Sequence, residues 1–291
     1  MTPLAGQPVV FVHDRLRPEE HMLLTALADR RLSVNQVYAP QLALSLDALP
    51  QAEVVMVRCL SQARSLAITL LYEAAGSTVV NSSSVIRTCG DKLATDAALT
   101  AAGVPTPQSG VAFTVDAALE LCEEFGWPVV MKPITGSWGR MVTRLSDADA
   151  VRAVIEHREV LGGPQHKVHY IQEYVDKPGR DIRVFVVGGE AICAIYRTSS
   201  DWITNTARGA VASNCPVNPE LRDIALAAAR AVGGGMLAVD IVESPVGLQV
   251  IEVNHTMEFR NSIATTGVNI PDMMAAYVSE QLTGLGEPVT L

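Results

Sequence analysis

Two short apolar stretches near the end of the chain constrain its fold most strongly. Residues 238–242 read Ala-Val-Asp-Ile-Val, residues 248–254 read Leu-Gln-Val-Ile-Glu-Val-Asn, and a Ser-Pro-Val-Gly sequence lies between them at 244–247. Two strand-like runs joined by a short turn predict a β-hairpin. Because side chains alternate along a strand, every second residue of each run should point to the same face of this hairpin.

Three side chains with oxygen atoms interrupt the hairpin, namely Asp240, Glu252 and Asn254. Glu252 and Asn254 should share a face, and the turn should fold Asp240 back almost opposite them. Solvated acids on an edge hairpin are the alternative interpretation, but these runs are apolar enough to be buried, and a buried carboxylate needs a partner. Hard oxygen ligands of this kind suit Mg²⁺, which binds one or two carboxylates together with substrate phosphates. We therefore predict that these residues bind Mg²⁺ beside a nucleotide.

The composition is that of an ordinary globular protein. With 291 residues, 48% of them hydrophobic, the chain can bury a substantial core and should hold two or three compact lobes. No run approaches a membrane span and the first residues lack a signal-peptide pattern, so we expect a cytoplasmic protein. The net charge of -9 gives no general attraction for nucleic acid or an anionic membrane. The cysteines are odd in number and lack Cys-x-x-Cys spacing, which predicts neither disulfides nor a zinc site; they are Cys59, Cys89, Cys122, Cys193 and Cys215.

The first part of the chain alternates between strand-like and helical patterns, which predicts a small α/β domain with a largely parallel sheet. No Gly-x-Gly-x-x-Gly motif follows the first strand, so a dinucleotide site is not expected. Arg58 and Ser61 follow the third strand, at the edge where open α/β sheets usually bind ligands. A helix start with solvated charges explains these two residues equally well. The predicted elements are strands at 9–12, 34–38, 54–57 and 78–81 and a helix at 19–30.

A lysine and a glycine-bearing loop follow one another in the middle of the chain. Glycines allow backbone N–H groups to approach an anion closely, and a nearby ammonium adds attraction, so this pair predicts a phosphate site. It is not a Walker loop, because the Gly-x-x-x-x-Gly-Lys-Ser/Thr spacing is absent. Lys92 lies in a helical segment predicted at 82–103 and would by itself be interpreted as a solvated lysine. The strand covers 127–133 and contains Lys132, and the loop comprises Gly136, Ser137, Trp138, Gly139 and Arg140.

Two arginines flank a polar loop between Trp202 and Gly209. Arg197 precedes this loop and Arg208 lies within it. Guanidinium groups can bind a carboxylate or a phosphate in a bidentate geometry, which predicts a substrate clamp. Ordinary surface ion pairs are the alternative. The loop follows a helix predicted at 148–161 and strands predicted at 168–175, 181–187 and 191–196.

In this order along the chain, these features resemble the RimK-related branch of the ATP-grasp superfamily of carboxylate–amine ligases. The segments QEYVDKPGRDIRVFVV (172–187), WITNTARG (202–209) and EVNHTMEFRNS (252–262) are similar to the ligases that join α-aminoadipate to the carrier protein LysW. The resemblance covers essentially the whole chain, including residues 14–18 and 58–62. The matching features are Lys92, Lys132, the glycine loop, the 172–175 connector and the Asp240–Glu252–Asn254 hairpin.

The resemblance implies an ATP-grasp fold, of mixed α/β and α+β architecture, that follows a Rossmann-like pre-ATP-grasp domain. The N-terminal α/β domain would cover residues 1–90. A central lobe at 91–175 would carry the glycine loop, and a C-terminal lobe at 176–291 would carry the Mg²⁺ site and the substrate loops. ATP would lie between the last two lobes.

The resemblance also implies a role for each candidate residue. Lys92, Lys132 and the loop from Gly136 to Arg140 would bind the phosphates of ATP, and the hairpin residues would bind Mg²⁺. Catalysis would depend on Lys132, Arg183 and Arg208. Further nucleotide contacts would come from Gln172, Glu173, Tyr174, Val175 and Ala207. The substrates would meet Arg58, Ser61, Arg197, Asn205, Arg208, Gly209, Glu258, Phe259, Arg260, Asn261 and Ser262.

The implied reaction joins the amino group of α-aminoadipate to the γ-carboxyl of the C-terminal glutamate of LysW, a small acidic carrier, in lysine biosynthesis. A carboxylate is a poor acyl donor, so ATP would first phosphorylate it and the amine would then displace phosphate. Asn261-Ser262 resembles the pair that goes with α-aminoadipate, whereas glutamate-using relatives resemble Gly-Phe there. Docking an acidic carrier on an acidic enzyme would need a local basic surface, for which Arg58, Arg64 and Arg87 are candidates.

Three other functions stay open at this point. They are the same ligation with glutamate in the arginine pathway, a RimK-like addition of glutamates to a protein tail, and an ATP-binding regulatory module without ligase activity. The complete set of lysines and metal ligands argues against the regulatory module, which needs no Mg²⁺ triad. An apolar helix predicted at 224–232 leaves room for a subunit interface, and we expect a homo-oligomer.

Overall fold

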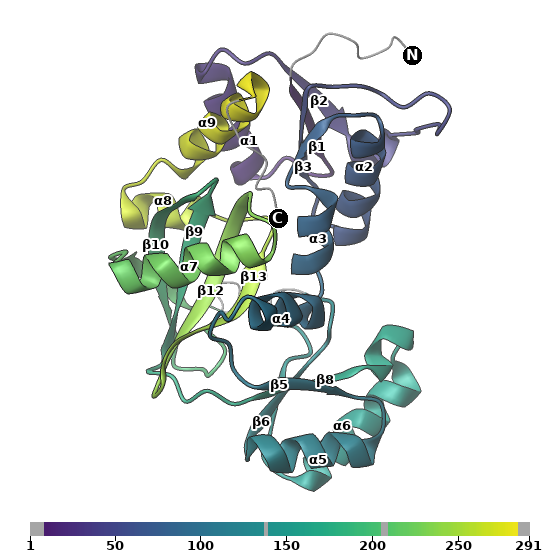
Figure 1. The fold of residues 1–291 in the computed structure, drawn as a ribbon, viewed down its shortest axis with the longest axis vertical. Coiled ribbons are helices and arrows are strands. Elements are labelled where there is room, and N and C mark those ends of the chain that lie inside the picture. The colour runs from purple at the N-terminus through teal and green to yellow at the C-terminus, as the bar shows by residue number, and fades with distance from the viewer. Residues whose placement is uncertain (1–8, 137–138, 205–208, 285–291) are drawn as a thin grey trace.

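The computed structural model describes residues 9–136, 139–204 and 209–284 and contains three sheets, each with its own helices (Figure 1). Their arrangement follows the chain: the first sheet is built from the N-terminal part, the second from the middle and the third from the C-terminal part. None of the helices in these described ranges is long and apolar enough to cross a membrane.

The N-terminal sheet is fully parallel and has the strand order β2-β1-β3-β4. Its strands β1 and β3 are apolar up to their last residues, His13 and Arg58, and buried along their whole length, as expected for strands with helices on both faces. The strands and the first helix agree with the sequence-based prediction. The elements are β1 (Val9–His13), α1 (Pro18–Asp29), β2 (Val34–Tyr38), a 3-10 turn (Ala39–Gln41), β3 (Val54–Arg58), α2 (Gln62–Ala74) and β4 (Thr78–Val80).

The helical segment predicted at 82–103 is two helices, α3 (Ser83–Cys89) and α4 (Lys92–Ala101). Gly90 ends α3, and Asp91 adopts an extended conformation in which its carboxylate accepts a hydrogen bond from the amide of Ala94 at 3.1 Å. This break places Lys92 at the start of a new helix, where its amide donates to the carbonyl of Ile134 at 2.8 Å. The residue therefore lies beside the segment that leads into the glycine loop.

The middle part of the chain forms an antiparallel sheet in the order β5-β8-β6-β7. Helices α5 and α6 pack on this sheet and close a separate apolar core around Cys122, Met131 and Ile155. Lys132 is the last residue of β6 and so stands at the rim of this sheet. The elements are β5 (Ser109–Ala112), α5 (Val115–Phe125), β6 (Val129–Lys132), β7 (Thr143–Leu145), α6 (Ala148–Leu161), a 3-10 turn (Pro164–Lys167) and β8 (His169–Glu173).

The C-terminal part forms an antiparallel sheet in the order β11-β10-β9-β12-β13. The predicted hairpin is confirmed as β12 and β13, and Asp240 pairs with Glu252 across it. A shift of register follows at once, because Ile241 pairs with Val250. The elements are β9 (Arg180–Val187), β10 (Glu190–Thr198), β11 (Val211–Cys215), α7 (Pro219–Ala231), β12 (Met236–Ser244), β13 (Gly247–Asn254), α8 (Arg260–Thr266) and α9 (Ile270–Thr283).

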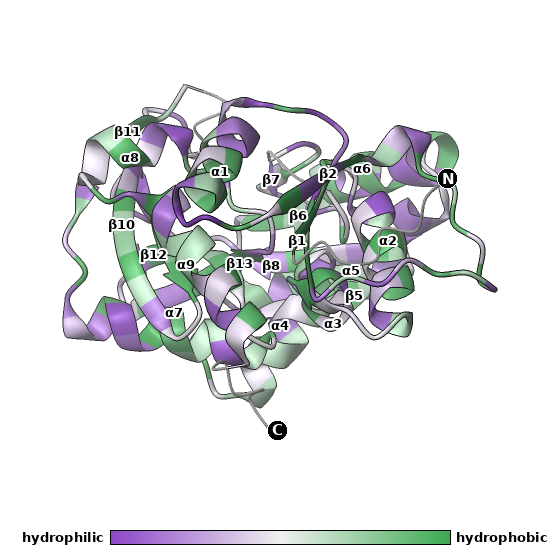
Figure 2. Cartoon of the chain, turned by 90° about the horizontal axis from the view of Figure 1, so that it is seen from above, coloured by the Kyte–Doolittle hydropathy of each residue, from purple (hydrophilic) through white to green (hydrophobic). Residues whose placement is uncertain are grey.

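Two apolar cores join the N-terminal and C-terminal parts of the chain. Helices α1 and α9 lie side by side between the two sheets (Figure 1) and share a core that includes Phe11, Phe185 and Met274. On the other face of the C-terminal sheet, α3, α4 and α7 pack around Leu99 and Leu237. Figure 2 shows both hydrophilic and hydrophobic residues along α7, and its buried residues Leu221, Ala225 and Ala228 recur every three or four positions, as a helix with one buried face requires. The domain boundaries predicted at 90/91 and 175/176 stay predictions.

Candidate functional site

A pocket lies between the central and C-terminal sheets. Its walls come from the end of β6, the flanks of the glycine loop, the 172–175 connector and the β12–β13 hairpin. These segments lie far apart in the sequence, and most of the residues predicted to bind ATP and Mg²⁺ meet here. The described residues that line it include Lys92, Lys132, Gly136, Gly139, Arg140, Gln172, Glu173, Tyr174, Val175, Arg197, Asp240 and Glu252.

The two predicted lysines occupy one side of the pocket. Lys92 Nζ donates a hydrogen bond to the carbonyl oxygen of Gly136 at 3.0 Å and lies 3.3 Å from Glu252 Oε1. Lys132 Nζ donates to Gln172 Oε1 at 2.6 Å. Burial lowers the pKa of Lys132 to about 8, an effect that the nearby Glu252 carboxylate opposes and the Lys92 ammonium adds to. Lys132 is thus a desolvated cation whose charge a phosphate group would stabilise.

A buried chain of hydrogen bonds extends from Lys132 into the central lobe. Gln172 accepts from Lys132 and donates through Nε2 to the hydroxyl of Tyr170 at 3.0 Å. That hydroxyl donates in turn to Asp96 Oδ2, which also accepts from Ser109 Oγ at 2.8 Å. Burial raises the pKa of Asp96, although its hydrogen bonds with Tyr170 and Ser109 oppose the rise. The chain fixes the side-chain amide of Gln172 and, through it, the position of the Lys132 ammonium.

Asp240 is buried beside Asn254, and two guanidinium groups hold its carboxylate. Arg183 donates to its two oxygens through Nε at 2.7 Å and Nη2 at 2.8 Å, and Arg197 Nη2 lies 3.2 Å from Oδ2. Asn254 Nδ2 donates to Oδ2 at 3.4 Å. Burial by itself would raise the pKa of Asp240, but Arg183 and Arg197 hold it below the usual value. The carboxylate is therefore charged at neutral pH.

The hairpin residues fit a hard cation by the chemistry of their donors. Asp240 supplies an ionised carboxylate, Glu252 pairs with it across the hairpin and is 31% exposed toward the pocket, and Asn254 adds an amide. In the described part of the chain, no group of three or more His, Cys, Asp and Glu side chains could hold a metal ion. Only two of the three predicted ligands, Asp240 and Glu252, are acids, so a metal there would depend on the Asn254 amide, on water and on substrate phosphates.

Arg197, predicted to bind substrate, is already engaged by two carboxylates of the protein. Its side chain is buried, and Nε donates to Asp181 Oδ1 at 2.6 Å while Nη2 faces Asp240. Asp181 also accepts a hydrogen bond from Thr204 and lies 3.7 Å from Lys177 Nζ. Sequence reasoning missed Asp181, Lys177 and Thr204 as members of the site. The available signal was the acid that opens the alternating strand at 181–187.

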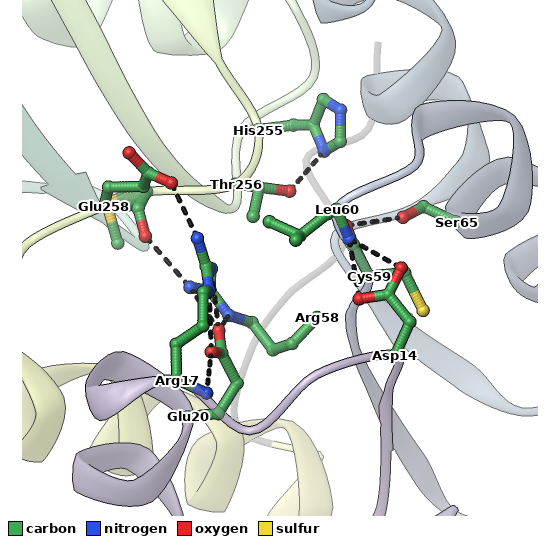
Figure 3. Close-up of polar contacts among 11 residues, drawn as sticks. Asp14, Arg17, Glu20, Arg58, Cys59, Leu60, Ser65, His255, Thr256 and Glu258 are labelled. Atoms are coloured by element: carbon green, nitrogen blue, oxygen red, sulfur yellow. Dashed lines mark hydrogen bonds and ion pairs between the residues drawn. The ribbon is translucent and has the colours of Figure 1, made fainter. Parts of the chain in front are cut away.

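The residues predicted to face the substrates divide into two groups. Arg58 is buried, not solvated, because Nη2 donates to Glu20 Oε1 and to the carbonyl of Met257, both at 3.1 Å (Figure 3). Burial also removes Arg58 from any basic docking surface. Ser61 caps α2 by accepting a hydrogen bond from the amide of Arg64 at 3.4 Å.

The second group lies at the start of α8. Glu258 accepts a hydrogen bond from Arg17 at 2.7 Å (Figure 3). Phe259 and Ser262 are buried. Arg260 and Asn261 are exposed.

Gly209 has φ +94°, a conformation that favours glycine. The predicted site residues Ser137, Trp138, Asn205, Ala207 and Arg208 lie outside the described residues.

Comparison with known proteins matches almost the whole chain to two known domain families. Residues 89–278 match the RimK-like ATP-grasp domain, and residues 9–88 match the LysX preATP-grasp domain. The chain is 35% identical over 276 residues to the glutamate–LysW ligase ArgX of Sulfurisphaera tokodaii, which covers 94% of this chain and 98% of that protein. It is 40% identical over 222 residues to the alpha-aminoadipate–LysW ligase LysX of Sulfolobus acidocaldarius, covering 76% of this chain and 80% of that protein.

A solved structure supports the same assignment. The RimK domain ATP-grasp protein of Sphaerobacter thermophilus has a TM-score of 0.79 and 29% sequence identity, covering 92% of this chain and 98% of that one. The predicted ATP-grasp fold with an N-terminal pre-ATP-grasp domain is therefore confirmed.

Proposed function

This chain belongs to the RimK-like ATP-grasp family of ligases, and we propose that it joins α-aminoadipate to a LysW-type carrier protein. The bond would form between the amino group of α-aminoadipate and the γ-carboxyl of the carrier's C-terminal glutamate, as a step of lysine biosynthesis. One observation carries the proposal: Lys92 and Lys132 line the same pocket as Asp240 and Glu252 of the β12–β13 hairpin. That arrangement suits a nucleotide triphosphate with its metal.

In this proposal the residues of the pocket divide the work of binding. Lys92 and Lys132 hold the phosphates, and Asp240, Glu252 and Asn254 hold Mg²⁺. When bound, MgATP supplies the phosphoryl group that turns a carboxylate into an acyl phosphate and a metal charge that offsets the phosphate oxygens. The pair Arg183 and Arg197 keeps Asp240 ionised and oriented, which is a better account of Arg197 than a direct contact with substrate.

The second half of the reaction needs no nucleophilic side chain from the protein. The amine of α-aminoadipate attacks the acyl carbon, a C–N bond forms, and the C–O bond to phosphate breaks with its electron pair leaving on phosphate. The amine loses its proton to solvent. The protein contributes positioning and charge, because a desolvated pocket strengthens each contact of the lysines and slows hydrolysis of the activated carboxyl.

The amino acid is proposed from the first turn of α8. Relatives named for glutamate and relatives named for α-aminoadipate have similar sequence identity to this chain, so overall identity does not distinguish the two amino acids. Asn261 and Ser262 are small and polar, which leaves room for the longer side chain of α-aminoadipate. Discrimination of one methylene through packing is worth about 1–3 kcal/mol, so we expect a clear preference that is not absolute.

The test is a ligation assay with purified components. The protein is incubated with ATP, Mg²⁺, a LysW-type carrier ending in glutamate, and either amino acid, and the carrier is analysed by intact mass. We expect one α-aminoadipate per carrier, ADP and phosphate in equal amounts, and capture of the activated carboxyl by hydroxylamine. AMP and pyrophosphate as products would refute acyl phosphate chemistry, and an unmodified carrier would refute the proposal.

A matched variant separates the proposed amino acid from its nearest rival. Replacing Asn261 by Gly and Ser262 by Phe should move the preference in kcat/KM towards glutamate. A wild-type enzyme that prefers glutamate would instead support the ArgX-like function. Repeated mass increments of glutamate would support tail modification, and ATP binding without product would support a regulatory module. The carrier's docking surface, a homo-oligomer and a cytoplasmic location also stay predictions.

A further inference from the structure

The segment at 255–259 has no helix or strand of its own. It links the end of β13, which carries two of the proposed metal ligands, Glu252 and Asn254, to α8, which carries Asn261 and Ser262. Most of its backbone groups are therefore not fixed by a ladder or a helix, although the Phe259 carbonyl accepts from the amide of Ser262 at the start of α8. Two of its carbonyls, those of His255 and Met257, are bound by side chains of the N-terminal domain, from the edge of the parallel sheet where its strands end.

Two side chains at that edge hold backbone carbonyls of the segment. Asn81, which follows β4, donates through Nδ2 to the carbonyls of Met236 at 2.9 Å and His255 at 2.7 Å. Arg58, the last residue of β3, donates to the carbonyl of Met257 at 3.1 Å. In open α/β sheets this edge usually binds a ligand. Here it binds a piece of the same chain.

A cluster of ion pairs also binds the segment (Figure 3). Glu20 is completely buried and accepts from Arg17 Nη2 at 2.9 Å and from Arg58 Nη2 at 3.1 Å. Arg17 Nη1 reaches across the domain junction to Glu258 Oε1 at 2.7 Å. Arg17 and Arg58 hold the pKa of Glu20 below its usual value against the effect of burial. The cluster thus joins the N-terminal domain to the residue that precedes Phe259 and the first turn of α8.

Buried ion clusters of this kind contribute little net stability, because desolvation offsets the attraction, but they do fix one geometry. We propose that Arg17, Glu20 and Arg58 are positioning residues of the amino-acid site. They hold the 255–259 segment so that the first turn of α8, with Asn261 exposed and Ser262 buried, is presented to the amino acid in one orientation. This inference rests on the proposed function, in which those two residues select the amino acid.

The chain offers a matched control for the Arg17–Glu258 pair. Arg30, which directly follows α1, donates to both oxygens of Asp272 in α9, at 2.8 and 2.9 Å. This ion pair joins the same two parts of the molecule as Arg17–Glu258, but Asp272 lies in α9, beyond α8 in the chain. Arg17→Gln and Arg30→Gln therefore each remove one ion pair between the same lobes, and Arg17→Gln in addition removes the contacts of Arg17 with Glu20.

Steady-state kinetics provide the first readout. Arg17→Gln should raise the KM for α-aminoadipate about tenfold or more, the usual effect of losing a charge-assisted hydrogen bond. Its Kd for ATP should be unchanged, and Arg30→Gln should change neither. Equal KM values in the two variants, or a parallel loss of ATP affinity in Arg17→Gln, would overturn the inference.

Amide hydrogen exchange provides a second readout that needs no activity. Exchange across 255–262 should be faster in Arg17→Gln and in Glu258→Gln than in the wild type, and unchanged in Arg30→Gln. The Glu258→Gln variant removes the same ion pair by changing its more exposed partner. It replaces Arg17→Gln in the test if Arg17→Gln does not fold. If the wild type joins no amino acid to the carrier, the proposed function fails. Hydrogen exchange still tests whether the ion cluster holds the 255–262 segment, because that measurement needs no activity. Unaltered exchange in both pair variants would overturn it.

Discussion

Removal of the Tyr170 hydroxyl tests the buried chain behind Lys132 most directly. In Tyr170→Phe the ring stays, so packing is conserved. Two buried groups lose a partner, because the hydroxyl accepts from Gln172 Nε2 at 3.0 Å and donates to Asp96. Each unsatisfied buried group costs about 1–3 kcal/mol. Asp96 keeps Ser109 as a partner, so we expect the free energy of unfolding to fall by about 2–4 kcal/mol in total.

The same change should reach the nucleotide site. Gln172 is the acceptor that holds Lys132 Nζ at 2.6 Å, and a Gln172 amide that is free to turn no longer fixes the ammonium. We therefore expect weaker ATP binding in Tyr170→Phe, measured by calorimetric titration, beside the lower stability measured by chemical denaturation.

Tyr72→Phe is the matched control for this variant. Tyr72 is also completely buried, but its hydroxyl has no hydrogen-bond partner among the residues that the structure describes. Its removal should leave stability unchanged or slightly higher, and ATP binding unchanged. If Tyr170→Phe behaves like Tyr72→Phe in both assays, the hydrogen-bonded chain from Asp96 to Lys132 does not support the site and the reasoning fails.

Three further predictions follow from particular contacts. Because burial lowers the pKa of Lys132 to about 8, its ammonium is present below pH 8 and lost above it. The Kd for ATP, measured by calorimetric titration, should therefore rise as the pH passes 8. The Lys132→Arg variant stays charged and should abolish that rise. Glu252→Gln keeps the shape but removes a charge from the proposed Mg²⁺ site, so turnover should fall more than ATP affinity, and near-normal turnover at low Mg²⁺ would contradict a metal role. Asn81→Ala leaves the amide of Met236 and two carbonyls without this partner, so denaturation should show a loss of about 2–4 kcal/mol; a loss near zero would mean that water replaces the side chain.

The sequence-based prediction was strongest where chemistry follows local periodicity. The alternation along 248–254 and the turn before it were sufficient to place Asp240 opposite Glu252. Lys132 at a strand end was recognisable because a glycine loop follows it directly. Lys92 was ambiguous, since its place in the pocket depends on the break after Gly90, and a helical pattern across 82–103 conceals that break.

The contacts that were missed depend on tertiary partners. Asp181 and Arg197 are 16 residues apart and meet because they lie opposite each other on the paired strands β9 and β10. Arg17 and Glu258 are 241 residues apart, so no local pattern indicates their ion pair. Strand β11 was not predicted either, because its sequence Val-Ala-Ser-Asn-Cys is short and mostly exposed at a sheet edge.

The core shared by α1 and α9 limits how this protein can be recombined with its relatives. Phe11 from the first sheet and Phe185 from the third belong to one apolar cluster, so a chimera that exchanges only residues 9–88 would pair two halves of a core that did not evolve together. The central lobe has its own core and can be transplanted with less disturbance. Altered amino-acid selectivity is therefore better sought by moving the N-terminal domain and the α8–α9 segment as one unit.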